Sequence, residues 1–174
     1  MCRQGRERLR LKIFSQVIII DQQKPPSLIN REQHGAIGAI MKVRPFPYSA
    51  LVVDDSPHMR ILLMRMLQKN GISSIESAVN GAEGVERYKS SKPDVVFLDA
   101  IMPEKDGLTA LREIKGLDPA AIVIMTTSLS EREKVLQFKD AGANYYLLKP
   151  FEEEKFIDTL GKVIAILAQR GKKE

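Results

Sequence analysis

Residues 50–56 read Ala-Leu-Val-Val-Asp-Asp-Ser, an apolar run that stops on two adjacent carboxylates. A short run rich in β-branched residues is typical of a buried strand. The pair Asp54 and Asp55 is costly at such a place, because two carboxylates about 4 Å apart repel by about 1 kcal/mol in water and about 4 kcal/mol at the effective dielectric of a partly buried site. Something in the folded protein must offset this repulsion.

Similar runs recur at regular intervals and alternate with amphipathic segments. The predicted strands are Ala50–Val53, Ile75–Val79, Val95–Leu98, Ile122–Met125 and Tyr145–Leu148. The first helix has one apolar stripe, formed by Met59, Leu62, Leu63, Met66 and Leu67, and we expect Gly71 to end it. Further helices are expected to begin near Ala82, Leu108 and Glu131, and the last carries apolar residues from Phe156 to Leu167.

Five strands that alternate with five helices predict parallel pairing with right-handed crossovers. The strands read as continuous apolar runs, which is expected of strands buried on both faces. The sequence therefore predicts an α/β domain, with a doubly wound five-stranded parallel sheet and helices on both of its faces.

The basic residues are unevenly distributed. The net charge is +5, but residues 1–48 hold nine Lys and Arg against three Asp and Glu, which leaves 18 against 19 in the rest. We therefore expect no nucleic-acid surface on the folded domain, and such a role through the basic extension stays an alternative. The single cysteine, Cys2, is compatible with a reducing cytoplasm. No apolar stretch is long enough to span a membrane, and the first 20 residues lack the cleavage site of a signal peptide.

Residues 1–48 do not share the alternating pattern. They contain Pro25-Pro26 and no clean period. We expect a disordered N-terminal extension, or a start assigned too far upstream, with the native chain beginning at Met41. The folded domain is expected at residues 49–168, followed by a short tail at 169–174 that leaves no room for an output domain.

Ligands of open parallel sheets bind beyond the carboxyl ends of the strands. The residues that follow the predicted strands there are Asp54, Asp55, Asp99, Thr126, Thr127 and Lys149. Taken singly, each has a plain alternative, since an aspartate or threonine can cap a helix and a lysine can be solvated. Three carboxylates and one ammonium at one edge instead favour a hard cation, for which Mg²⁺ with a phosphoryl group is the natural candidate.

Four motifs in this order resemble the receiver domain of bacterial response regulators, of the single-domain chemotaxis (CheY-like) type. They are Val53-Asp54-Asp55-Ser56, the stretch from Asp99 through Met102-Pro103 to Asp106-Gly107, Met125-Thr126-Thr127-Ser128, and Lys149-Pro150-Phe151. The resemblance runs from about Ser49 to Leu167. It implies a flavodoxin-like sheet in the order 2-1-3-4-5, and a phosphoacceptor signalling protein rather than an enzyme.

The resemblance also implies a role for each site residue. Asp99 is expected to accept the phosphoryl group of a histidine kinase, and Asp54, Asp55, Asp99 and the backbone carbonyl of Ile101 to hold Mg²⁺. Lys149 is expected to pair with Asp99 and then with the phosphoryl group, ahead of a cis peptide at Pro150. Thr127 and Tyr146 are the expected switch. They would report phosphorylation to a protein partner at the face formed by the fourth helix, fifth strand and fifth helix.

Two variable positions are apolar in this chain. Ile101 and Leu129 flank the path of the hydrolytic water in the family, and neither can hydrogen-bond that water, so we expect slow self-dephosphorylation. Three alternatives remain at this stage. A phosphorelay or stress-adaptor receiver would use the same residues. A metal-dependent aspartyl-phosphate phosphatase would need a general acid where Ile101 stands, and a flavin-binding domain would need a phosphate-binding loop where Asp54 and Asp55 would repel the phosphate.

Overall fold

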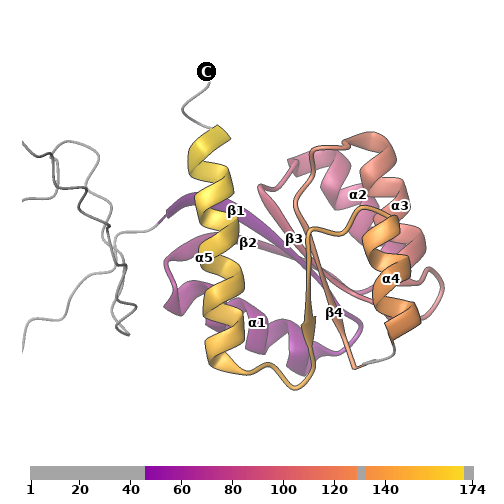
Figure 1. Cartoon of the computed structure of the whole chain (residues 1–174), viewed down its shortest axis with the longest axis horizontal. Helices are drawn as coiled ribbons and strands as arrows, with labels where there is room; N and C mark the ends of the chain where they lie inside the picture. Colours follow the sequence, from indigo (N-terminus) through magenta and orange to yellow (C-terminus); the bar gives the residue numbers. More distant parts are fainter. Residues whose placement is uncertain (1–45, 129–131, 171–174) are drawn as a thin grey trace, which may run out of the picture. The chain divides into compact units, whose positions relative to one another are not determined.

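The computed structural model describes residues 46–128 and 132–170, in which five strands alternate with five helices (Figure 1). The strands are β1 (Phe46–Val53), β2 (Ile72–Ala78), β3 (Val95–Asp99), β4 (Val123–Thr127) and β5 (Tyr145–Leu148). The helices are α1 (Pro57–Lys69), α2 (Gly81–Ser91), α3 (Gly107–Leu117), α4 (Arg132–Asp140) and α5 (Glu153–Arg170). Within this part of the chain, no helix combines the length and the apolar character needed to cross a membrane.

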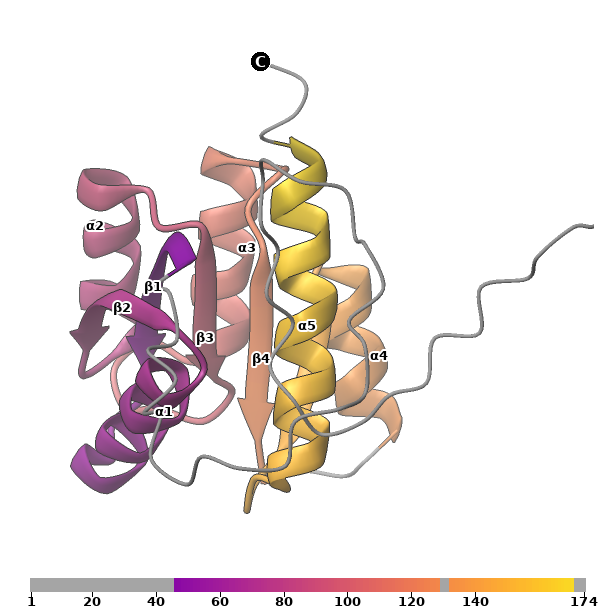
Figure 2. The same ribbon diagram turned by 90° about the vertical axis from the view of Figure 1, so that its left-hand side faces the viewer.

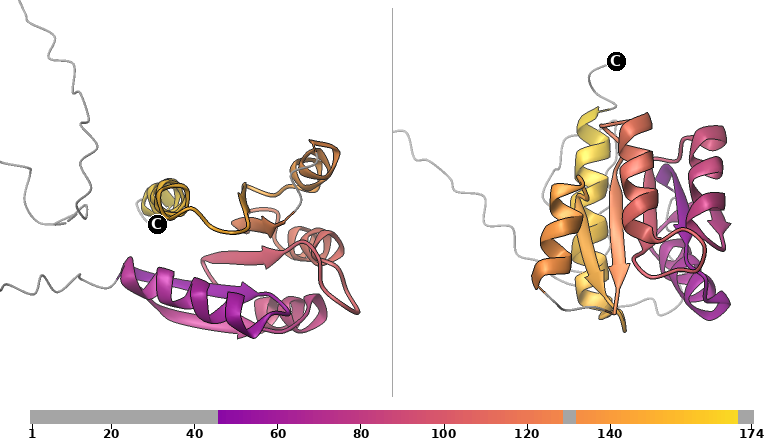
Figure 3. Two further views of the ribbon diagram at one scale, coloured as in Figure 1. Left: turned by 90° about the horizontal axis from the view of Figure 1, so that it is seen from below. Right: turned by 90° about the vertical axis from the view of Figure 1, so that its right-hand side faces the viewer.

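All strands pair in parallel, in the order β2-β1-β3-β4-β5. Helices α1 and α5 cover one face of the sheet, and α2, α3 and α4 cover the other (Figures 2 and 3). The predicted doubly wound sheet and its strand order are therefore confirmed. Because all strands run in the same direction, the residues that follow β1, β3, β4 and β5 lie at one edge of the sheet.

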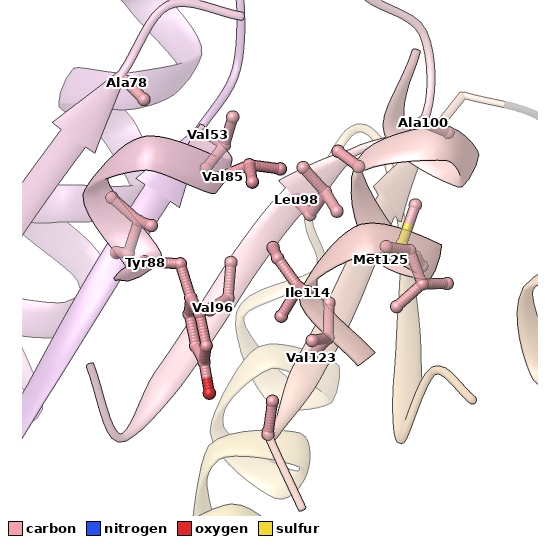
Figure 4. Close-up of a cluster of buried hydrophobic side chains, with 14 of the residues drawn as sticks. Val53, Ala78, Val85, Tyr88, Val96, Leu98, Ala100, Ile114, Val123 and Met125 are labelled. Carbon is pink, nitrogen blue, oxygen red and sulfur yellow. The ribbon is translucent and has the colours of Figure 1, made fainter. Parts of the chain in front are cut away.

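The sheet separates two apolar cores. One core joins inward side chains of β1, β3 and β4 to α2, α3 and α4, and it includes Val53, Val96, Leu98 and Met125 (Figure 4). The other lies under α1 and α5 and is centred on Phe97, whose ring stacks on that of Phe156 at 5.8 Å. The central strands β3 and β4 are buried along their whole length, which holds the site at their carboxyl ends in a rigid frame.

The helix ends follow local sequence signals. The Ser56 hydroxyl accepts the amide of Met59 at the start of α1, and Pro57 occupies the first turn. Gly71 follows the end of α1 at a φ of 90°, a conformation that glycine adopts without strain. The predicted stop at Gly71 is confirmed. Ser56 itself is the N-cap, so neither Asp54 nor Asp55 caps α1.

Two features of the strands differ from the prediction. Strand β1 begins at Phe46, four residues earlier than expected, because its first residues pair only with β2 and Pro47 is tolerated on the side without a partner. Strand β2 is not a continuous buried run. It lies at the sheet edge, and its residues Ser73, Ser74 and Glu76 are exposed. Of the extension expected at residues 1–48, residues 46–48 belong to β1, and residues 1–45, with the expected start at Met41, lie outside the described residues. Leu129 and residues 171–174 lie outside them too.

Candidate phosphoacceptor and metal site

Three carboxylates gather at the carboxyl edge of the sheet. Asp99 is the last residue of β3, and Asp54 directly follows β1, where its amide donates to the carbonyl of Ala78. One carboxylate oxygen from each of Asp54, Asp55 and Asp99 lies within 4.8 Å of the others. Asp54 is fully buried and Asp99 is 5% exposed, whereas Asp55 is exposed to solvent. This set of oxygen donors suits a hard divalent cation that keeps part of its water shell.

Lys149 provides the positive charge that we expected beside these carboxylates. Its ammonium lies 2.7 Å from Asp54 Oδ2 and 2.9 Å from Asp99 Oδ2, and its side chain is 13% exposed. Lys149 is therefore not a solvated surface lysine, and it pairs with Asp54 as well as with the expected Asp99. One ammonium facing two buried carboxylates and a third beside them leaves the site with a net negative charge, which favours metal binding.

The electrostatic environment of Asp99 reflects both burial and charge. Burial raises the pKa of the Asp99 carboxyl, and the neighbouring Asp54 raises it further. The ion pair with Lys149 and a weak contact from the Ile101 amide oppose that rise in pKa. Lys149 favours the ionised form of Asp99, and an ionised carboxylate is the nucleophile that acyl phosphate chemistry needs.

Arg60 is a site residue that sequence reasoning missed. Its guanidinium donates to the main-chain oxygen of Asp54 at 2.7 Å and to that of Asp55 at 3.1 Å. The amide of Ser56 donates to Asp54 Oδ1 at 2.9 Å from the same loop. The only signal in the sequence was a basic residue in the first turns of α1, and such a residue is more often a solvated side chain.

Gly107 allows the β3–α3 loop to close tightly beneath Asp99. A Cβ added at Gly107 would lie 1.9 Å from the carbonyl oxygen of Asp99, and the Gly107 amide donates to the carbonyl of Ala100. No other residue can occupy this position without moving the main chain of β3. The Asp-Gly pair of the second sequence motif thus has a steric reason, because Asp106 caps α3 while Gly107 gives the close approach.

The two threonines that end β4, Thr126 and Thr127, are fully buried at the edge of the sheet where the site lies. Thr126 Oγ1 finds no hydrogen-bond partner among the described residues. The Thr127 carbonyl accepts the amide of Lys149 at 2.8 Å, which joins the ends of β4 and β5. The peptide bond between Lys149 and Pro150 is cis.

Comparison with known proteins agrees with this geometry. The family model of the response regulator receiver domain matches residues 50–161. The chain belongs to the response regulator receiver family. Chemotaxis protein CheY of Bacillus subtilis is 40% identical over 114 residues, which cover 66% of this chain and 95% of the relative. Protein PilH of Pseudomonas aeruginosa is 41% identical over 118 residues, which cover 66% and 96%.

A solved structure similar to this receiver contains bound ligands. The Borrelia burgdorferi complex of CheX and CheY with BeF₃ and Mg²⁺ superposes with a TM-score of 0.66 at 32% identity, covering 68% of this chain and 90% of that one. The receiver described above therefore has the CheY-like fold, and its acidic cluster is compatible with a metal site of the same kind.

The remaining predicted residues lie outside the acidic cluster of Asp54, Asp55 and Asp99. The Tyr146 side chain is 49% exposed on β5, and the Ile101 side chain is 57% exposed in the β3–α3 loop. An exposed aromatic on a strand and an exposed Ile beside a charged site are both suited to contacts that form in another state or with another molecule.

Proposed function

We propose that this chain is the receiver of a two-component response regulator and is phosphorylated on Asp99 by a histidine kinase. The observation that carries the proposal is the double ion pair of Lys149 with the buried carboxylates of Asp54 and Asp99. It places an ammonium beside a carboxylate nucleophile, where it can pair with incoming phosphoryl oxygens. The receiver would span residues 49–168, or from Phe46 if its first strand is counted in full.

In the proposed phosphoryl transfer, the reacting groups are the Asp99 carboxylate and a phosphohistidine of the kinase. A carboxylate oxygen of Asp99 attacks the phosphorus of a phosphohistidine, the phosphorus–nitrogen bond breaks, and the imidazole nitrogen leaves with that electron pair. The product is an acyl phosphate on Asp99. Lys149 already lies 2.9 Å from the Asp99 carboxylate and would shift its ion pair to the added phosphoryl oxygens.

Asp54, Asp55 and Asp99 would hold Mg²⁺ together with the main-chain carbonyl of Ile101. The donor set supports this, because the three carboxylates lie within 4.8 Å of one another and Asp55 is open to solvent, which leaves space for bound water. When bound, Mg²⁺ supplies positive charge that offsets the carboxylates and the transferred phosphoryl group.

The decisive experiment combines a phosphodonor with intact-mass measurement. We expect the full chain, incubated with Mg²⁺ and a small acyl phosphate donor, to gain one phosphoryl group. The gain should be absent in Asp99→Asn and after chelation of the metal, and unchanged in Asp158→Asn, a matched loss of an exposed carboxylate on α5. No gain in wild-type mass, or a gain that survives Asp99→Asn, would overturn the proposal.

The output would pass through Thr127 and Tyr146 to the face formed by α4, β5 and α5. This face carries the half-exposed Tyr146 and a shallow cavity of about 220 Å³ whose lining includes Phe151 and Lys155. A buried hydroxyl that moves onto the phosphoryl group would give the tyrosine ring room to turn inward and so change that face for a protein partner. Solvent exposure of Tyr146 should fall when the chain is phosphorylated, and this can be measured by its tyrosine NMR signals.

Chemotaxis is the proposed pathway, since the similar proteins from Bacillus subtilis and several other organisms are chemotaxis proteins CheY. The relatives include PilH, which is not named as a chemotaxis protein, and a phosphorelay or stress-adaptor receiver is therefore the second candidate. Phosphorylation-dependent binding to a chemotaxis protein of the same cell, compared with phosphoryl transfer to a second histidine-containing protein, would separate the two.

We further propose that the acyl phosphate is long-lived. The exposed Ile101 side chain lies two residues after Asp99 and cannot hydrogen-bond a hydrolytic water. Ile101→Asn should shorten the lifetime of the phosphorylated chain, measured by decay of the added mass. The same test applies to Leu129→Glu, and unchanged lifetimes in both variants would contradict this prediction.

A further inference from the structure

The β3–α3 loop, residues 100–106, contains an unusual turn. Glu104 has a φ of 65°, and the amide of Lys105 donates to the carbonyl of Pro103 at 2.8 Å. This is a γ-turn with positive central φ, a rare and strained form, and it is centred on a residue that is not glycine. Such a turn persists only where its surroundings hold it in place.

The N-terminus of α2 provides that support. Asn80 uses both ends of its side-chain amide, because Oδ1 accepts the amide of Glu83 at 2.8 Å and Nδ2 donates to Glu104 Oε2 at 3.0 Å. The next residue, Gly81, lies so close to the loop that an added Cβ would come within 2.5 Å of the Lys105 carbonyl oxygen. The loop therefore packs directly on the first turn of α2.

The same loop begins at the phosphoacceptor. Its base is closed by the hydrogen bond from the Gly107 amide to the Ala100 carbonyl, and the carbonyl of Ile101 follows immediately. The Ile101 carbonyl thus lies between the closed base on one side and the γ-turn on the other. A metal ligand in a short loop contributes affinity only in the fraction of molecules in which the loop is correctly placed.

We propose that the hydrogen bond between Asn80 and Glu104 is a clamp that positions the β3–α3 loop for metal binding at the acidic cluster. This inference rests on the proposed function, since it assigns two positioning residues to the same site. Neither residue touches the metal or the phosphoryl group in this role. They act through the main chain of the loop, and the clamp offsets the strain of the γ-turn.

The test is a Mg²⁺ titration of the full chain by calorimetry, with variants of matched charge. Glu104→Ala and Glu104→Gln lose the same carboxylate charge, but only Gln keeps an oxygen that can accept from Asn80. We expect Glu104→Ala to bind Mg²⁺ about threefold more weakly than Glu104→Gln, which is the scale of one net hydrogen bond. In an Asn80→Ser background, which keeps a good helix cap, the two Glu104 variants should bind equally.

Two further readouts separate positioning from stability. Glu104→Ala should unfold at a slightly lower urea concentration than Glu104→Gln, because it lacks one hydrogen bond, whereas the local effect should appear as faster amide exchange at residues 101–105 in Glu104→Ala. If the wild type binds Mg²⁺ and the two variants bind it with equal affinity, the clamp is overturned and the proposed function stays intact. A wild type that neither binds Mg²⁺ nor gains a phosphoryl group would overturn both.

Discussion

Replacing Lys149 by methionine tests the central electrostatic argument. The substitution keeps an unbranched side chain and removes both ion pairs, at 2.7 Å to Asp54 and 2.9 Å to Asp99. Removing one partner of a buried ion pair costs about 3–5 kcal/mol. Since the Lys149 side chain retains 13% exposure, we expect the lower end, a loss of about 3 kcal/mol in the free energy of unfolding at neutral pH without Mg²⁺.

The loss should shrink as the pH falls. Burial raises the pKa of Asp99 and Lys149 opposes that rise, so the variant should have a still higher pKa at Asp99. A carboxyl whose pKa is raised by folding contributes stability that is fully present below its unfolded pKa and is lost as the pH rises through its folded pKa. The difference in free energy of unfolding between the wild type and the variant should therefore shrink as the pH falls from neutral toward the unfolded pKa of an aspartate, about 4.

Urea unfolding followed by circular dichroism, from pH 7.5 down to pH 5, measures this directly. Lys162→Met is the matched control, because Lys162 pairs at 2.6 Å with Asp158 on the exposed face of α5, and its unfolding midpoint should stay close to wild type. A loss below about 1 kcal/mol for Lys149→Met, within the range of an exposed pair, would refute the buried-pair reasoning. A loss that grows toward low pH would refute it equally.

Three further outcomes follow from the same geometry. Gly107→Ala should unfold at a much lower urea concentration than the wild type, because its Cβ would lie 1.9 Å from a main-chain oxygen of β3. Gly116→Ala is the control, since Gly116 has open space around it on α3, and it should raise the free energy of unfolding by about 0.5–1 kcal/mol. Asp55→Asn should raise stability without Mg²⁺ and abolish the stabilisation that added Mg²⁺ gives, as thermal unfolding can show. Tyr88→Phe should lower the free energy of unfolding by about 1 kcal/mol at pH 7, since it removes the hydrogen bond to Asp118. That bond lowers the pKa of Asp118, so in the variant this pKa should rise toward its ordinary value, as an NMR titration can show.

The sheet and most of its site could be predicted because their signals are local. Each central strand is a short apolar run, and the residue after it faces the same edge as its neighbours once the strands are parallel. Asp54, Asp99 and Lys149 were found in this way, and the structure brings them together. The helix stop at Gly71 was equally local, because it depends on one backbone conformation.

The contacts that were not predicted join segments distant in the sequence or involve the main chain. The early start of β1 was hidden by Pro47, whose tolerance depends on which strand pairs with that end. The hydrogen bond between Asn80 and Glu104 spans 24 residues, and although Glu104 lies within the second motif, nothing in the sequence pairs it with Asn80. Side chains that bind main-chain oxygens, as Arg60 does, leave little trace in a sequence, because the acceptor can be any residue.

The three carboxylates of the site differ in burial, and this difference decides how their mutual repulsion is offset. Asp54 and Asp99 are buried and share one ammonium, so each of these carboxylates has an opposite charge in contact with it. Asp55 is exposed, and no basic side chain of the described residues forms an ion pair with it. The Arg60 guanidinium contacts the main-chain oxygen of Asp55, and the Asp55 carboxylate itself faces solvent and is open to a cation. In the function proposed above, Lys149 would stabilise the buried part of the site, while a metal ion would bind at its solvent side, next to Asp99.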